Sequence, residues 1–297
     1  YWDAFKASLK QAADDNLALI SAGVAFFAML SLFPALAALI ALLGLISDPV
    51  VVIAQLEDVR GLLPDDVYDI INTQVTGLVT ARADTLGWAG IVSLLVALWS
   101  ARAGVGAMVI GLNAVYNERN RNAAKHYLHA LMLTVSLVGV GIVALLAVVV
   151  APIILAFIPL GPFGNAVADL LRWTVATAVL FAGVGVLYRF GPNRRAARLP
   201  WLSSGAILAV MSWAVLSIGF SYYVANFGNY NQVYGSIGAV IAMLVWLWIS
   251  SFLILFGAAL NAQVERRTRP DSTIGPAKPR GQRGAEAADT FIDITQE

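Results

Sequence analysis

The chain has 297 residues, of which 59% are hydrophobic and 12% are charged, and its formal net charge is +1. Soluble domains carry about 25% charged residues. This composition and a mean hydropathy of +0.76 exclude an ordinary soluble enzyme and predict a polytopic membrane protein. The chain has no cysteine and two histidines, which excludes disulfides, thiolate metal sites and histidine-rich metal centres. We therefore expect no bound metal and no cofactor.

The first two predicted elements are a surface helix and a long span. In residues 1–16, Trp2, Phe5 and Leu9 are spaced for one helical face, which is typical of a short helix lying on the membrane surface. Residues 17–46 form an apolar run that is longer than the hydrocarbon core of a bilayer requires. We expect this span to kink at Pro34, where Ser31 can bond a carbonyl that the proline frees.

Residues 47–85 differ from both neighbouring segments, because acidic residues there exceed the two basic residues Arg60 and Arg82. The apolar positions after Pro64 fall on one helical face. The pattern predicts amphipathic helices that are too polar to span, one of them an interfacial helix over residues 65–81. We expect this segment to cap the bundle on the extracytoplasmic side.

The second span, residues 86–112, carries one charge near its middle, Arg102. Helix geometry places Arg102 roughly 20 Å from Trp88 and therefore at membrane depth. A guanidinium keeps its proton, so it needs a partner or water there. No other long apolar stretch has an acidic residue near its centre. The candidate neighbours are polar side chains on its own helix and at the ends or kinks of others: Ser100, Asn113, Ser31, Asn261 and Gln263.

Two interpretations of Arg102 remain open from the sequence. If the polar neighbours close around the guanidinium, Arg102 ties helices together and has a structural role. If its donors remain unused, it faces a pocket and contacts an anionic substrate, because intramembrane charges are functional candidates by default.

The remaining spans are predicted over residues 131–158, 167–187, 201–225 and 237–260. Asp169 and Arg172, three residues apart, are expected to pair. His126 and His129 lie in a basic loop, where two histidines give a weak metal signal and an interfacial role is favoured. The aromatic and amide-rich residues 220–238 suit either an interfacial belt or a substrate entrance.

Basic residues gather in alternate segments: residues 1–15, 117–129, 188–200 and the C-terminal tail. By the positive-inside rule, both termini of the six-helix domain, residues 17–267, are cytoplasmic. Residues 268–297 are rich in Pro, Gly, Arg, Lys and Ala, which predicts a disordered cytoplasmic tail.

Three motifs resemble those of the YihY/BrkB family of bacterial inner-membrane proteins. They are DNLALISAGVAFFAMLSLFPAL at 15–36, ALWSARAG with LNAVYN between 97 and 117, and YGSIGAVIAMLVWLWISSFLILFGAALNAQVE at 234–265. The resemblance extends to about residue 267. It implies an all-α fold with six transmembrane helices in the inner membrane. Older annotation of this family was ribonuclease-like, and some members are discussed as transporters in lipid or envelope contexts. It implies no catalytic residues.

We expect the protein to be a transporter or flippase of an anionic or amphiphilic, lipid-like molecule, working among membrane lipids. The alternative is a non-transporting scaffold for envelope assembly, with a homo-oligomeric or envelope-protein partner. A ribonuclease is the least favoured function. The chain has no P-loop, nucleophile elbow or HExxH motif, so we expect neither enzymatic activity nor nucleic-acid binding.

Overall fold

The computed structural model describes residues 2–46, 72, 83–147, 161–194, 203–226, 231–268, 272–273 and 278–292. The helices in these parts are α1 (Trp2–Asp14), α2 (Leu17–Ile46), α5 (Ala83–Tyr116), α6 (Ala123–Leu145), α8 (Gly161–Phe190), α9 (Ser204–Asn226), α10 (Asn231–Arg266) and α11 (Glu286–Asp289). The predicted interfacial helix over residues 65–81 lies outside the described residues, apart from Asn72.

The prediction of an all-helical membrane protein with six spans is confirmed. Within the described residues, six helices are long and apolar enough to cross a bilayer: Leu17–Ala38, Gly90–Tyr116, Ala123–Ala144, Ala166–Phe190, Ser204–Tyr223 and Gly238–Arg266. Their order along the chain agrees with the prediction, while several helix ends differ.

The largest difference concerns the third span, which begins at Ala123 rather than at residue 131. Asn122 starts this helix, because its side chain accepts a hydrogen bond of 3.0 Å from the Lys125 backbone N–H. The predicted loop over residues 117–129 therefore shortens to residues 117–122, and both histidines lie in α6. A polar first turn obscured this helix start, because the sequence criterion looked for apolar residues.

Two asparagines in the left-handed region separate neighbouring helices. Asn16, with φ of 52°, stands between α1 and α2. Asn117, with φ of 58°, ends α5. After it, the Glu118 N–H donates to the Asn113 carbonyl at 2.8 Å, and the Asn117 N–H donates to the Ala114 carbonyl at 2.9 Å. This pair of bonds is a Schellman motif, which satisfies carbonyls that the end of a helix leaves unpaired.

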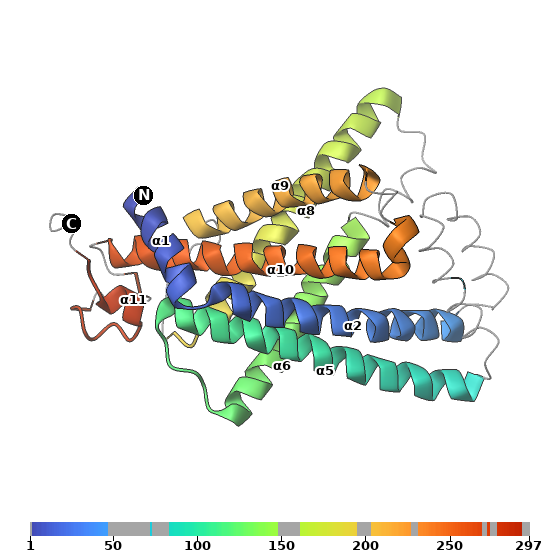
Figure 1. The fold of residues 1–297 in the computed structure, drawn as a ribbon, viewed down its shortest axis with the longest axis horizontal. Helices are drawn as coiled ribbons and strands as arrows, with labels where there is room; N and C mark the ends of the chain where they lie inside the picture. The colour runs from blue at the N-terminus through green and yellow to red at the C-terminus, as the bar shows by residue number, and fades with distance from the viewer. Residues whose placement is uncertain are drawn as a thin grey trace.

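Figure 1 shows α2, α5 and α10 side by side along the long axis, with α9 above α10 and with α6 and α8 crossing them steeply. The most extensive helix contact joins α2 to α5, and α10 also packs on α2 and α9. The first and last helices of the described residues, α1 and α11, lie at the same end of the bundle (Figure 1). We call this the terminal end; it carries α1, α11 and the C-terminal ends of α5 and α10.

The best-packed core lies toward the terminal end, where side chains from three spans are fully buried: Leu17, Leu112, Tyr116 and Leu255. Outward-facing apolar side chains along the spans stay exposed, such as Trp99 at 53%, Val215 at 69% and Ile218 at 72%. An apolar exterior of this kind suits lipid, since lipid tails are as apolar as these side chains.

The C-terminal tail also differs from its prediction. The sequence predicted disorder from residue 268 onward, but residues 278–292 form turns and the short helix α11 at the terminal end. Asp289 organises this segment by accepting the backbone N–H groups of Gly281 at 2.7 Å and Arg283 at 3.1 Å. The Ile292 N–H donates to the Arg266 carbonyl at 3.0 Å and attaches the segment to α10. The bond from Ile292 to Arg266 is tertiary, so composition did not reveal it.

Candidate functional site

Arg102, the intramembrane charge, packs against α6. Its guanidinium carbon lies 4.2 Å from the centroid of the Tyr127 ring, which is a cation–π distance. The side chain is half-buried. Tyr127 stands in the first two turns of α6 and is 47% exposed, so this contact lies at the edge of the bundle.

A glycine one turn beyond Arg102 allows α6 to come close. A Cβ atom at Gly106 would lie 3.2 Å from His126 Nε2 and 3.8 Å from the Ala130 Cβ. His126 thus packs on the surface of α5 beside the Arg102–Tyr127 contact. His129 does not join His126 at a shared site, because its Nε2 lies 2.6 Å from the Phe190 carbonyl oxygen.

The Arg102 guanidinium keeps unused donors. Its Nε is buried and has no hydrogen-bond partner within the described residues. The one ion pair within the described residues joins Arg194 to Glu265, so Arg102 has no acidic partner there. Arg172, another arginine within a span, is not paired with Asp169, contrary to the prediction; its guanidinium carbon lies 5.8 Å from the Trp173 ring centroid.

None of the five predicted neighbours forms a hydrogen bond with Arg102 in the part of the chain that the structure describes. Ser31 donates to the Ala28 carbonyl of its own helix at 2.8 Å, near the Pro34 position. Ser100 is fully buried, and its hydroxyl has no partner among the described residues.

Asn113 connects loops at the terminal end. Its Nδ2 donates to Asn120 Oδ1 at 2.8 Å, and its Oδ1 accepts the backbone N–H of Asn193 at 2.7 Å. Arg121 reinforces the same junction by donating to the Gly191 carbonyl at 3.0 Å and the Pro192 carbonyl at 3.1 Å. Residues 191–194 are thereby held against the segment that joins α5 to α6.

The other two predicted neighbours also have partners away from Arg102. Asn261 accepts the Gly205 N–H at 2.8 Å and donates to Ser203 Oγ at 2.8 Å, so it caps the start of α9. Gln263 Nε2 donates to Gln11 Oε1 at 2.7 Å and joins α10 to α1. These amides hold the bundle together at its terminal end.

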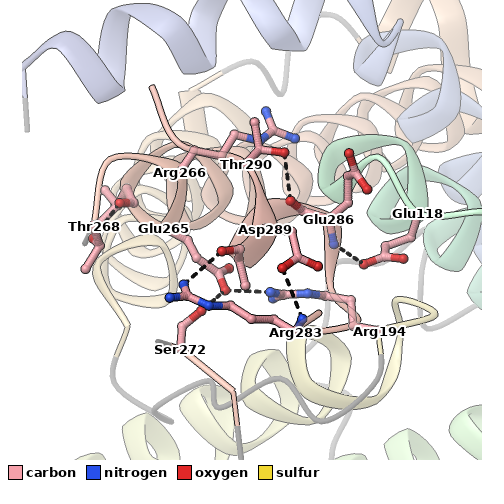
Figure 2. Close-up of polar contacts among 12 residues, drawn as sticks. Glu118, Arg194, Glu265, Arg266, Thr268, Ser272, Arg283, Glu286, Asp289 and Thr290 are labelled. Carbon is pink, nitrogen blue, oxygen red and sulfur yellow. Dashed lines mark hydrogen bonds and ion pairs between the residues drawn. The ribbon is translucent and has the colours of Figure 1, made fainter. Parts of the chain in front are cut away.

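A buried ion pair at the terminal end was not predicted from the sequence. Arg194 Nη2 lies 2.6 Å from Glu265 Oε1, and the two side chains are 1% and 9% exposed. Figure 2 shows the pair together with Ser272, whose Oγ also donates to Glu265 Oε1. The Arg194 guanidinium carbon lies 4.4 Å from the centroid of the buried Tyr116 ring. The sequence held one signal for this pair. Glu265 is an isolated acidic residue near the end of the last span, and residues 188–200 contain four arginines without an acidic residue.

A cavity of about 520 Å³ opens between α1, the ends of α5 and α10, and the C-terminal segment. Its lining mixes both signs of charge: Lys10, Asp14, Asp15, Arg266 and Glu286. Beside this region, Glu118 Oε1 accepts the Glu286 N–H at 3.1 Å (Figure 2). Burial raises the pKa of the Glu118 carboxyl above its ordinary value. The described residues contain no group of three or more His, Cys, Asp or Glu side chains placed to hold a metal ion.

The comparison with known proteins identifies the family. A family model described as virulence factor BrkB matches residues 8–282. The chain belongs to this family. The match to the BrkB family includes all six candidate spans, so the resemblance inferred from the sequence motifs is confirmed.

Relatives of this BrkB-family chain carry two kinds of name. The ribonuclease-like protein YfkH of Bacillus subtilis (strain 168) is 32% identical over 84% of this chain and 91% of that protein. A UPF0761 membrane protein of Alteromonas mediterranea is 26% identical over 88% of this chain and 87% of that protein. A UPF0761 membrane protein of Xanthomonas campestris pv. campestris (strain B100) is 33% identical over 34% of this chain and 24% of that protein. No solved structure matches the chain.

Proposed function

We propose that this BrkB-family membrane protein is a transporter or flippase of an anionic or amphiphilic, lipid-like molecule, and that Arg102 binds the negative group of that molecule. The observation that carries the proposal is the half-buried Arg102 guanidinium on a membrane span, which no described acid neutralises. A charge at this depth is costly unless a partner or water reaches it.

The contact with Tyr127 supports an anionic ligand rather than a purely structural role. The aromatic ring attracts the guanidinium through its face, while the N–H donors of the guanidinium point outward in its own plane. A phosphate or carboxylate can bind those donors while the ring stays in place, and the planar fork suits two parallel oxygen contacts. The exposed Tyr127 leaves this position open to an amphiphile in the bilayer.

The proposed orientation in the membrane rests on the distribution of basic residues. We place the protein in the bacterial inner membrane with both termini cytoplasmic, because the basic segments fall on one side when the spans alternate. The helices α1 and α11, which precede and follow the spans, lie at a common end of the bundle, as an even number of spans requires (Figure 1). Arg102 would then contact a substrate that enters from the cytoplasmic half of the membrane.

Reconstitution into phosphatidylcholine vesicles tests the proposal. Movement of fluorescent phosphatidylglycerol between leaflets would be followed by dithionite quenching, with fluorescent phosphatidylcholine as the neutral comparison and with or without an imposed ion gradient. We expect Arg102→Gln to slow the anionic lipid by about 10- to 100-fold, since hydrogen bonds to charged groups contribute about 1.5–3 kcal/mol. Arg102→Lys keeps the charge but loses the fork, so an intermediate rate is expected.

Arg172→Gln is the matched control, because it removes another arginine from a span, also next to an aromatic ring. Its rate should equal that of the unmodified protein. An unchanged rate in Arg102→Gln, at normal folded yield, would remove Arg102 from the substrate site. If the unmodified protein moves neither lipid under any gradient, lipid transport is excluded.

A further inference from the structure

The N-terminal helix α1 packs against the α10 span through aromatic side chains. The Trp2 and Phe5 rings are stacked with centroids 6.0 Å apart. Phe5 in turn meets Phe256 of α10 edge-on, with centroids 5.7 Å apart. The apolar face that the sequence predicted for α1 therefore packs on α10 through Phe5, while Trp2 on the same face stays exposed.

A second cavity lies where α1 meets α9 and α10. It has a volume of about 340 Å³ and is lined by Trp2, Phe5, Leu208 and Leu260. The lining is therefore entirely apolar or aromatic. Trp2 is 66% exposed, so the cavity is open at the surface of the protein. A water-filled apolar cavity is unfavourable, because removing apolar surface from water lowers the free energy.

The position of this cavity indicates what fills it. Leu208 lies in the first two turns of the α9 span, and Leu260 lies near the terminal end of the α10 span. Next to Leu208, α9 exposes a strip of large apolar side chains along its length: Ile207, Met211, Val215 and Ile218. An acyl chain lying on this lipid-facing strip reaches the cavity without leaving an apolar surface.

A positive charge stands at the rim. The Lys6 ammonium lies 5.3 Å from the centroid of the Trp2 ring, which lines the cavity. An apolar slot with an adjacent cation matches the two parts of an anionic phospholipid, its acyl chain and its phosphate. Interfacial helices with basic residues beside an apolar face bind such lipids by burying apolar area and by attracting the negative headgroup.

We propose that α1 and the ends of α9 and α10 form a binding site for one anionic phospholipid, with an acyl chain in the Trp2–Phe5–Leu208–Leu260 cavity and the phosphate at Lys6. The lipid fastens α1 to the bundle at the membrane surface. This site is separate from Arg102 and does not rest on the proposed transport function.

Fluorescence quenching by brominated lipids tests this site in the full-length protein. The protein would be placed in phosphatidylcholine vesicles that contain increasing fractions of dibrominated phosphatidylglycerol, or dibrominated phosphatidylcholine for comparison. Trp2 is one of eight tryptophans. Its own quenching is the difference between the unmodified protein and Trp2→Phe, which keeps an aromatic ring at the rim. We expect Trp2 to be quenched at lower fractions of phosphatidylglycerol than of phosphatidylcholine.

The Lys6→Gln variant tests the phosphate contact. It should raise the phosphatidylglycerol fraction needed for half-maximal Trp2 quenching roughly fivefold, the effect of about one lysine near an anionic surface. Lys125→Gln, which removes an exposed lysine from the start of α6, should leave that fraction unchanged. Equal quenching by both lipids, or no effect of Lys6→Gln, would overturn the anionic site. An unquenched Trp2 would overturn lipid binding in the cavity, whatever the transport assay shows.

Discussion

Arg194 and Glu265 are two charges that the fold places almost entirely out of water. Removing such groups from water costs several kcal/mol for each ion, so the pair is favourable only if its geometry is good. Here the 2.6 Å contact, the Tyr116 ring at the guanidinium and the Ser272 hydroxyl on the carboxylate contribute. Arg194 Nε and Nη1 and Glu265 Oε2 are buried without a hydrogen-bond partner in the described part of the chain. The pair also joins the segment after α8 to the end of α10.

We expect Glu265→Gln to destabilise the protein strongly, because it leaves the buried Arg194 charge without compensation. Breaking one side of a buried pair typically costs about 3–5 kcal/mol. The midpoint of thermal unfolding in detergent, followed by tryptophan fluorescence, should fall clearly. The double variant Arg194→Gln with Glu265→Gln should lose less than Glu265→Gln alone. A double variant as unstable as the sum of the two single variants would show that the two charges are not coupled.

Glu118 links pH to stability through its raised pKa. The chief cause is burial, and the nearby charges of Glu286 and Glu265 act in the same direction. Between its ordinary value of 4.5 and the raised pKa, the folded protein holds this proton more often than the unfolded chain does. The free energy of unfolding therefore falls as the pH rises through this window. Its contribution is complete below pH 4.5 and is lost above the folded pKa.

Glu118→Gln should remove this part of the pH dependence. The amide oxygen can still accept the Glu286 N–H, while the ionisation is gone. We expect the variant and the unmodified protein to have the same unfolding temperature near pH 4. At pH 7 the variant should have the higher unfolding temperature. The difference between the two proteins, measured from pH 4 to pH 7, isolates Glu118 from other groups. A constant difference would contradict the burial of this carboxyl.

At the scale of helices, α8, α9 and α10 approach one another through backbone. A Cβ atom at Gly257 of α10 would lie 2.5 Å from Tyr188 Oη and closer still to the Gly205 carbonyl oxygen of α9. Tyr188 of α8 donates its hydroxyl to the Ile254 carbonyl at 2.6 Å. Small residues permit such close helix contacts in membranes, where packing and hydrogen bonds replace the hydrophobic effect as the force between helices.

Gly257→Ala should therefore weaken the α8–α9–α10 contact. Overpacking costs about 1–3 kcal/mol, or more where backbone must move, so we expect a lower folded yield and a lower unfolding temperature. Gly219→Ala in α9 is the control, because a Cβ atom there meets nothing within 4 Å. Alanine is also the better helix former, by about 0.5–1 kcal/mol. Similar losses in both variants would show that close packing at Gly257 is not the cause.

For the whole molecule, we predict that the terminal end faces the cytoplasm. The chain has no native cysteine, so single cysteines can be placed and labelled from each side. A cysteine at Lys125, exposed at the start of α6, should react only with a reagent that reaches the cytoplasm. A cysteine at position 75, in the acidic segment outside the described residues, should react from the opposite side. The reverse pattern would invert the orientation and with it the side from which Arg102 is reached.

The sequence by itself determined the class, the number of spans and the family. These follow from local properties: a long apolar run spans a bilayer whatever its neighbours are, because every backbone group is satisfied within its own helix. The same reasoning identified Arg102 as an isolated charge in α5, since depth depends only on its position along one helix. Helix ends were less accurate, because an asparagine cap such as Asn122 or Asn117 resembles an ordinary loop residue.

Only the tertiary structure decided which side chains meet. Of the five polar residues predicted around Arg102, four bond elsewhere and Ser100 has no hydrogen-bond partner within the described residues. Tyr127, which the sequence did not indicate, contacts the guanidinium instead. Arg194 and Glu265 are 71 residues apart in the chain and become partners because the segment after α8 meets the end of α10. The ordered segment at residues 278–292 likewise depends on a docking surface made by other elements. Pairing between helices depends on their rotation and tilt, which a pattern of apolar residues along one chain does not specify.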